Sequence, residues 1–130
     1  MSREILQPAG WTRPRGYTNG IAAGGRQVFV SGQIGWDGEQ RFASEDFAAQ
    51  TRQALANVVA VLACAGARPE HLVRMTWYVT SRDEYNASLV EIGAAYRELI
   101  GRNFPAMSVV VVAGLLEPRA KVEIEATAVV

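Results

Sequence analysis

The C-terminal stretch VEIEATAV, residues 122–129, carries the side chains best suited to acid–base chemistry. Apolar residues alternate there with Glu123 and Glu125, so the pattern predicts a strand with one apolar face and one face that carries carboxylates. A carboxylate that loses its water at a buried seam has a raised pKa and can then hold and activate a water molecule. Glu123 is therefore a candidate general base. An exposed strand glutamate or an interfacial ion pair would give the same pattern, and Glu125 lies on the same face.

Other polar and aromatic residues are candidates for binding a ligand. Tyr17 lies in the glycine-flanked stretch RGYTNG, where it can donate a hydrogen bond, stack on a ligand or simply pack. Ser31 has no partner base at a recognisable spacing and no GxSxG stretch exists, so a serine nucleophile is not indicated. Trp36 and Trp77 can form an aromatic wall or fill a core or an interface.

Metal and nucleotide chemistry lack their usual residues. His71 is the only histidine and Cys64 the only cysteine, so a metal site has no companions for either residue, and we expect Cys64 to be a small buried hydrophobe. Neither a GxGxxG nor a GxxxxGK[ST] stretch occurs. We expect no metal and no cofactor.

Charge and hydropathy narrow the class of partner. Lys and Arg total 13 and so do Asp and Glu, a balance that argues against a nucleic-acid or anionic-membrane partner. No run of 18 apolar residues occurs, and MSREILQPAG lacks the pattern of a secretion signal. Together with the lone cysteine, these features lead us to expect a cytoplasmic protein.

The candidate residues must be positioned by one domain, expected over residues 1–130. Helices are predicted to begin at Ser44 and at Ser81, and to end at Gly66 and Gly101. Their order with the strands suggests an α+β fold, one sheet with two helices across one face. The strand patterns are RQVFVSGQI (26–34), HLVRMTWYVTS (71–81), MSVVVVAGLL (107–116) and KVEIEATAVV (121–130).

Two helices can cover only one face of a sheet. The valine run 109–112 nevertheless has the composition of a strand that is buried on both faces, and each such burial is worth roughly 1.5 to 3 kcal/mol. We therefore expect the uncovered face to pack on another copy of the chain. This predicts an obligate homo-oligomer, with Glu123 or Glu125 in or beside the interface.

Six stretches, taken together and in order, resemble the Rid (YjgF) family of reactive-intermediate imine and enamine deaminases. The resemblance covers nearly the whole chain and implies a chorismate-mutase-like fold, a homotrimer, and ligand clefts between neighbouring subunits. Tyr17 matches the family's early tyrosine, Ser31 and Gly32 its SGQ strand, and Glu123 its water-positioning glutamate. The stretches are RGYTNG, VFVSGQIG, QTRQALANVVAVLACAGA, TWYV, NFPAMS and VEIEATAVV.

Met107 departs from the family pattern, because it stands where the deaminases have an arginine that holds the substrate carboxylate. Val109 likewise stands where many have a cysteine. A guanidinium binds a carboxylate through two charge-assisted hydrogen bonds, each worth about 1.5 to 3 kcal/mol. Methionine has no charge and no donor, and provides only an adaptable apolar surface. The departure implies a less acidic ligand. Arg15 is an alternative source of charge, ahead of Arg13 and Arg119, unless it is simply a solvated loop residue.

Two functions from different classes follow. The first is a divergent imine or enamine deaminase, a hydrolase in which Glu123 activates water while Tyr17 and Ser31 orient the substrate. Its small-molecule site is then lined by Met107, Arg15, Gly32 and Trp36. The alternative is a non-catalytic trimer that binds a small, largely apolar metabolite. Ribonuclease activity, which some labels of the family carry, is not favoured by the neutral charge or the single histidine.

Overall fold

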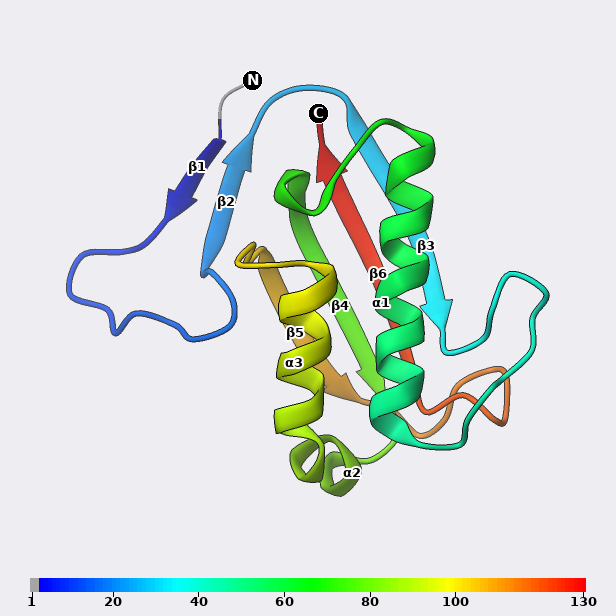
Figure 1. Cartoon of the computed structure of the whole chain (residues 1–130). Coiled ribbons are helices and arrows are strands. Elements are labelled where there is room, and N and C mark those ends of the chain that lie inside the picture. The colour runs from blue at the N-terminus through cyan, green and yellow to red at the C-terminus, as the bar shows by residue number, and fades with distance from the viewer. Residues whose placement is uncertain (1–2) are drawn as a thin grey trace.

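A computed structural model describes residues 3–130 as a four-stranded sheet with helices on one face and a separate two-stranded ribbon (Figure 1). The elements, in chain order, are β1 (Arg3–Leu6), β2 (Gly20–Ala23), β3 (Gln27–Ile34), α1 (Phe47–Cys64), the 3₁₀ helix η1 (Pro69–His71), β4 (Leu72–Val79), α2 (Arg82–Ala87), α3 (Leu89–Leu99), β5 (Ala106–Val111) and β6 (Val122–Val129).

The main sheet has the strand order β3-β6-β4-β5. The β4–β5 pair is parallel, and β6 pairs antiparallel with both β3 and β4. Figure 1 shows α1 and α3 lying across the same face of this sheet, with the β1–β2 ribbon standing to one side. The predicted α+β class, with a sheet whose helices share one face, is thus confirmed.

Two local predictions about the helices are wrong in detail. Ser44 does not cap α1; its hydroxyl accepts from the Asp46 amide, and the Asp46 carboxylate accepts from Ala49 N at 2.9 Å instead. The predicted second helix is two helices, because Ser88 leaves helical geometry with φ −110° and ψ 12° between α2 and α3. Ser81 does cap α2 as predicted, by accepting from Glu84 N at 3.1 Å.

The core lies between the helices and the covered face of the sheet. The side of α1 that faces the sheet is buried, and its buried residues include Leu55, Val58 and Leu62. They pack in one cluster with Trp77 of β4 and Ile124 of β6. Burial of each large apolar side chain contributes roughly 1.5 to 3 kcal/mol, so this cluster holds α1 and α3 to the sheet.

Cys64 and the valine run are more exposed than their composition predicts. Cys64 occupies the last turn of α1 with its side chain in solvent. Val109, Val110 and Val111 are 36%, 41% and 51% exposed, because β5 is an edge strand and no described element covers its end. One chain therefore does not bury this run on both faces.

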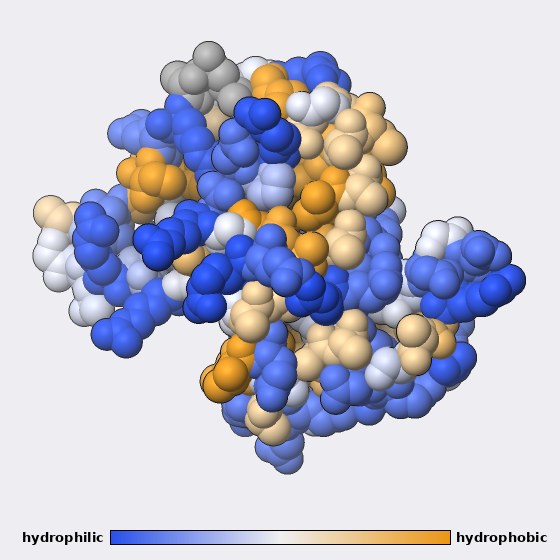
Figure 2. Space-filling model, viewed as in Figure 1, coloured by the Kyte–Doolittle hydropathy of each residue, from blue (hydrophilic) through white to orange (hydrophobic). Residues whose placement is uncertain are grey.

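The helix-covered face is mainly polar at its periphery. Figure 2 shows mainly hydrophilic residues over the segment that projects at the right, and scattered apolar groups over the middle, the left and the lower part of this face. No helix among residues 3–130 has the length and hydropathy needed to span a bilayer.

Candidate functional site

The carboxylates of β6 lie on the face of the sheet that no helix covers. Val122, Ile124 and Ala126 are buried toward the helices, so the alternate residues Glu123 and Glu125 point to the opposite face. Both glutamates are half-buried. The predicted face of carboxylates is therefore present, and the sequence pattern was sufficient to find it.

Glu125 is held by a neighbour, whereas Glu123 is not. Tyr78 of β4 donates its phenolic hydrogen to Glu125 Oε1 at 2.7 Å. This hydrogen bond, together with partial loss of water and the nearby carboxylates, raises the pKa of Tyr78. No hydrogen bond or ion pair within residues 3–130 holds the Glu123 carboxylate, which leaves it free to bind water or a ligand.

Gly32 allows Glu123 its position. The register of β3 against β6 shifts between Val30 and Gln33, so Ser31 and Gly32 form an irregular step in the strand. A Cβ atom at position 32 would overlap the carboxylate and Cγ of Glu123. The structure thus brings together two of the predicted site residues, one as the carboxylate and one as the glycine that makes room for it.

Ser31 lies on the same uncovered face but in a neighbouring hollow. It lines a cavity of about 370 Å³ together with Arg74, Thr76 and Glu125. Its side chain is exposed and its carbonyl accepts from Gln33 Nε2 at 3.1 Å. Ser31 is therefore placed to bind a ligand, and no base in this part of the structure is bonded to its hydroxyl.

Met107 lies on the opposite face of the sheet from Glu123. In the parallel β4–β5 pair it is opposite Met75, which is fully buried toward the helices, whereas Glu123 is opposite Tyr78, which points the other way. Side chains that share a face of a sheet are two residues apart along a strand, so these two registers fix the two faces. A pocket lined by both Met107 and Glu123 therefore needs two copies of the chain.

Met107 lines a cavity of about 510 Å³ between α3 and β5, which we call the α3–β5 cavity. Its other apolar walls come from Trp77, Leu89, Ile92 and Phe104. Phe104 stacks on Tyr96, with ring centroids 5.9 Å apart and planes at 4°. Burial raises the pKa of Tyr96, whose hydroxyl donates to the Asn103 carbonyl at 2.5 Å. The cavity is large enough for a small organic molecule.

Sequence reasoning missed two residues of this cavity, Arg97 and Arg102. Arg97 occupies the last turn of α3, directly after the buried Tyr96. Arg102 follows Gly101, whose φ of +79° turns the chain out of the helix. Their signal in the sequence was their position on either side of the helix end predicted at Gly101, which places both at the end of one groove.

Tyr17 and Arg15 lie in the loop between β1 and β2. They line a cavity of about 440 Å³ with Arg13, Ile5 and Phe104. The loop is attached to the body where Thr18 N donates to the Pro105 carbonyl at 3.1 Å, next to the start of β5. The predicted neighbours Tyr17 and Arg15 thus share one cavity, with Phe104 between it and the α3–β5 cavity.

Trp36 and Arg119 belong to the far edge of the sheet. Trp36 follows β3 and packs on Phe42, with ring centroids 5.8 Å apart. Arg119 lies 4.9 Å over the Phe42 ring and donates to Glu45 Oε1 at 2.6 and 3.0 Å. Arg119 is therefore already occupied, and within one chain Trp36 does not share a cavity with Met107 or Tyr17.

Among residues 3–130 no three metal-ligating side chains gather.

Sequence comparisons relate the chain to named deaminases. A family model described as Endoribonuclease L-PSP matches residues 12–130. The 2-iminobutanoate/2-iminopropanoate deaminase of Salmonella typhimurium is 35% identical over 116 residues, which are 87% of this chain and 86% of that protein. Protein DfrA of Myxococcus xanthus is 36% identical over 111 residues, 81% of this chain and 77% of its own.

Solved structures give the same relationship. The protein YyfB of Yersinia pestis, described as a conserved Rid-family protein of unknown function, has a TM-score of 0.87 and 32% identity over 100% of both chains. Escherichia coli TdcF with bound serine has a TM-score of 0.69 and 29% identity over 98% of both chains. With a family match over almost its entire length and relatives above 30% identity, the chain belongs to the Rid (YjgF) family.

Proposed function

We propose that the protein is an imine or enamine deaminase, a hydrolase in which Glu123 holds and activates the attacking water. The observation that carries this proposal is the difference between the two glutamates of β6: the Glu123 carboxylate is free and lies against Gly32, whereas Glu125 is bound by Tyr78. The names of relatives such as the Salmonella typhimurium deaminase support the reaction class.

The reaction requires one water and no cofactor. Glu123 accepts a proton from water as the oxygen attacks the imine carbon, which gives a tetrahedral carbinolamine. Glu123 returns this proton to the nitrogen. It then carries the hydroxyl proton of the carbinolamine to the nitrogen as the C–N bond breaks, so that ammonia and a carbonyl product are released. Glu123 ends the cycle deprotonated. Tyr17 and Ser31 are assigned to orient the substrate through their hydroxyl groups.

The proposed assembly is a homotrimer of chorismate-mutase-like fold with ligand clefts between subunits. Support comes from the placement of Met107 and Glu123 on opposite faces, which only a neighbouring copy can bring together. The uncovered face also leaves Phe29 71% exposed, and Val110 projects from the same face at 41%. Burial of such residues against another copy would favour association. A cytoplasmic location is part of the proposal.

Ammonia release tests the reaction. Imines are generated in situ from a panel of amino acids by an amino-acid oxidase, and the rate of ammonia formation is measured with and without the protein. We expect acceleration by the wild type, and a loss of about 100-fold or more in Glu123→Gln, because a general base contributes about 10²- to 10⁴-fold. Glu125→Gln is the matched control and should stay within about threefold of wild type. An unaccelerated panel, or full activity in Glu123→Gln, contradicts the proposal.

A non-catalytic binding trimer is the second candidate. It is favoured by the α3–β5 cavity, whose apolar lining and Met107 suit the retention of an apolar ligand. In that case a ligand screen by thermal shift should find compounds that raise the melting temperature saturably without being turned over. Turnover of any such compound would favour the deaminase.

A further inference from the structure

The α3–β5 cavity combines an apolar interior with an excess of positive charge. Its lining includes Arg97 and Arg102 but no aspartate or glutamate. Several other arginines are engaged elsewhere: Arg52 pairs with Glu98 and Arg68 with Glu70. Neither arginine of the cavity forms an ion pair within residues 3–130. Two unpaired guanidinium groups at one cavity are complementary to an anion.

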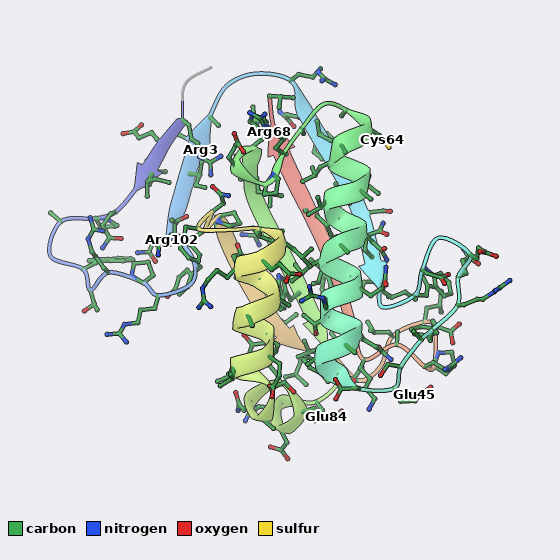
Figure 3. The ribbon with its side chains drawn as sticks, in the orientation of Figure 1. Arg3, Glu45, Cys64, Arg68, Glu84 and Arg102 are labelled. Carbon is green, nitrogen blue, oxygen red and sulfur yellow. The ribbon has the colours of Figure 1, made fainter. Side chains whose placement is uncertain are left out.

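The two arginines come from adjacent turns of the chain. Arg97 is in the last turn of α3, and Figure 3 shows Arg102 on the loop that leads from α3 to β5, on the side facing the β1–β2 ribbon. Both side chains are exposed at the end of the groove, whereas Ile92, Trp77 and Met107 line it more deeply. The cavity thus has a cationic mouth and an apolar interior.

A third observation concerns Trp77. Its side chain is 2% exposed, and its indole Nε1–H has no acceptor within residues 3–130. Buried indole N–H groups usually have a hydrogen-bond partner, since leaving one unpaired costs free energy. Trp77 lines the cavity. Because the nitrogen itself has almost no accessible surface, Trp77 contributes the apolar part of its ring to the cavity wall and not a donor for the ligand.

We propose that the α3–β5 cavity binds a monocarboxylate with a bulky apolar side chain, whose carboxylate is held by Arg97 and Arg102. This inference rests on the proposed function and names its substrate class: 2-imino acids with branched aliphatic or aromatic side chains, and the matching 2-oxo acid products. Met107 then forms an apolar wall for the side chain, and the charge that position 107 lacks comes from the end of α3. Small acids bind weakly, because they cannot fill about 510 Å³.

The same arginines also lie where a cation stabilises α3, because positive charges near a helix C-terminus interact favourably with the helix dipole. That role predicts a loss of thermal stability when they are removed, with ligand affinity unchanged. The two roles therefore differ in what is measured. Ligand affinity and melting temperature must be recorded for the same variants.

Isothermal titration with 2-oxo acids tests the proposal without requiring turnover. The ligands are 4-methyl-2-oxopentanoate, phenylpyruvate and pyruvate, with 4-methylpentan-2-one as the match that lacks the carboxylate. We expect the two bulky acids to bind at least about tenfold more tightly than pyruvate, and the ketone to bind at least about tenfold more weakly than its acid. Pyruvate binding as tightly as the bulky acids would overturn the assignment.

Variants of the arginines locate the site. Arg97→Gln and Arg102→Gln should each weaken the bulky acids by about threefold or more, and the double variant by about tenfold or more, since both side chains are solvent-exposed. The control is Arg41→Gln, which removes an exposed arginine whose one ion pair among residues 3–130 is with Glu39, in the loop after β3. Titrations are done below the melting temperature of every variant. Unchanged affinity in the folded double variant contradicts the proposal, whatever its melting temperature.

The outcome separates this proposal from the deaminase itself. Arginine-dependent binding of bulky 2-oxo acids in a chain that hydrolyses no imine would support the cavity and reject the deaminase. Hydrolysis whose KM is unaffected by loss of both arginines would support the deaminase and reject this role of the cavity.

Discussion

The two faces of the main sheet differ in what they offer a ligand. The face without helices carries Glu123, a free carboxylate seated against Gly32, but little enclosed apolar volume. The face under α3 has a larger and more apolar cavity with Met107 and two arginines, but no carboxylate to act as a base. Each face holds what the other lacks. The comparison shows why the proposed deaminase site needs two copies of the chain, because a single copy keeps Glu123 and Met107 on opposite faces of the sheet.

Mixing two inactive variants gives the largest effect and tests the comparison directly. Glu123→Gln disables the uncovered face, and Met107→Asp places a repelling carboxylate in the cavity. If each site joins the face of one copy to the cavity of another, a site is intact only when its Glu123 comes from a Met107→Asp copy and its Met107 comes from a Glu123→Gln copy. Each condition is met half the time, so random mixing at equal amounts leaves about a quarter of the sites intact. We expect each variant alone to show under about 1% of wild-type deaminase activity, and the co-refolded mixture to recover well above either parent. A mixture no more active than its parents would place the whole site in one chain.

The sequence predicted the uncovered face better than the cavity, for a physical reason. Strand alternation has a period of two, so the spacing of Glu123 and Glu125 was enough to assign their common face. The cavity depends on how α3 crosses β5 and where the chain turns at Gly101, which are tertiary features. Met107 was identified only through its place in a family pattern, and its separation from Glu123 required the β4–β5 register.

The exposed valines show the same limit. Composition predicted a strand buried on both faces, but burial depends on the strand's place in the sheet, and β5 is at the edge. The composition of a strand reflects every contact that the strand makes, including any contact with another copy, whereas the structure of one chain shows only the contacts within that chain. The prediction of an oligomer therefore rests on the contrast between composition and exposure at residues 109–111.

A change at Gly32 tests the uncovered face alone. Gly32→Ala introduces a Cβ that overlaps the Glu123 carboxylate, so the side chain must move. We expect deaminase activity to fall by about 10- to 100-fold, because small displacements of a catalytic group are costly. Binding of 4-methyl-2-oxopentanoate at the cavity should change by less than about threefold. Gln27→Ala, at an exposed position at the start of the same strand, is the control for a general disturbance of β3. Equal activity in Gly32→Ala and wild type would show that the position of Glu123 is unimportant.

Met107→Arg tests the cavity alone. An arginine at this position would add a charge-assisted partner for a carboxylate inside the cavity, where no acid competes for it. We expect pyruvate to bind about tenfold more tightly, and the bulky acids to lose part of their advantage as the apolar wall is replaced. The measurement is titration calorimetry, with Met107→Leu as the apolar match. Unchanged pyruvate affinity would show that Met107 does not contact the ligand.

Tyr78 offers the smallest effect, and one that depends on pH. Its hydrogen bond to Glu125 raises the pKa of its hydroxyl above the ordinary value of 10.0, so folding favours the neutral phenol. The resulting stability is fully present below pH 10 and is lost as the pH rises through the higher pKa of the folded state. Urea midpoints measured from pH 8 to 11.5 should therefore fall more steeply above pH 10 in the wild type than in Tyr78→Phe. Deaminase activity of Tyr78→Phe at neutral pH should stay within about threefold of wild type, because this tyrosine is hydrogen-bonded to Glu125 and not to Glu123. A large loss of activity in Tyr78→Phe would mean that the two glutamates act together, and the distinction between a held and a free carboxylate would have to be abandoned.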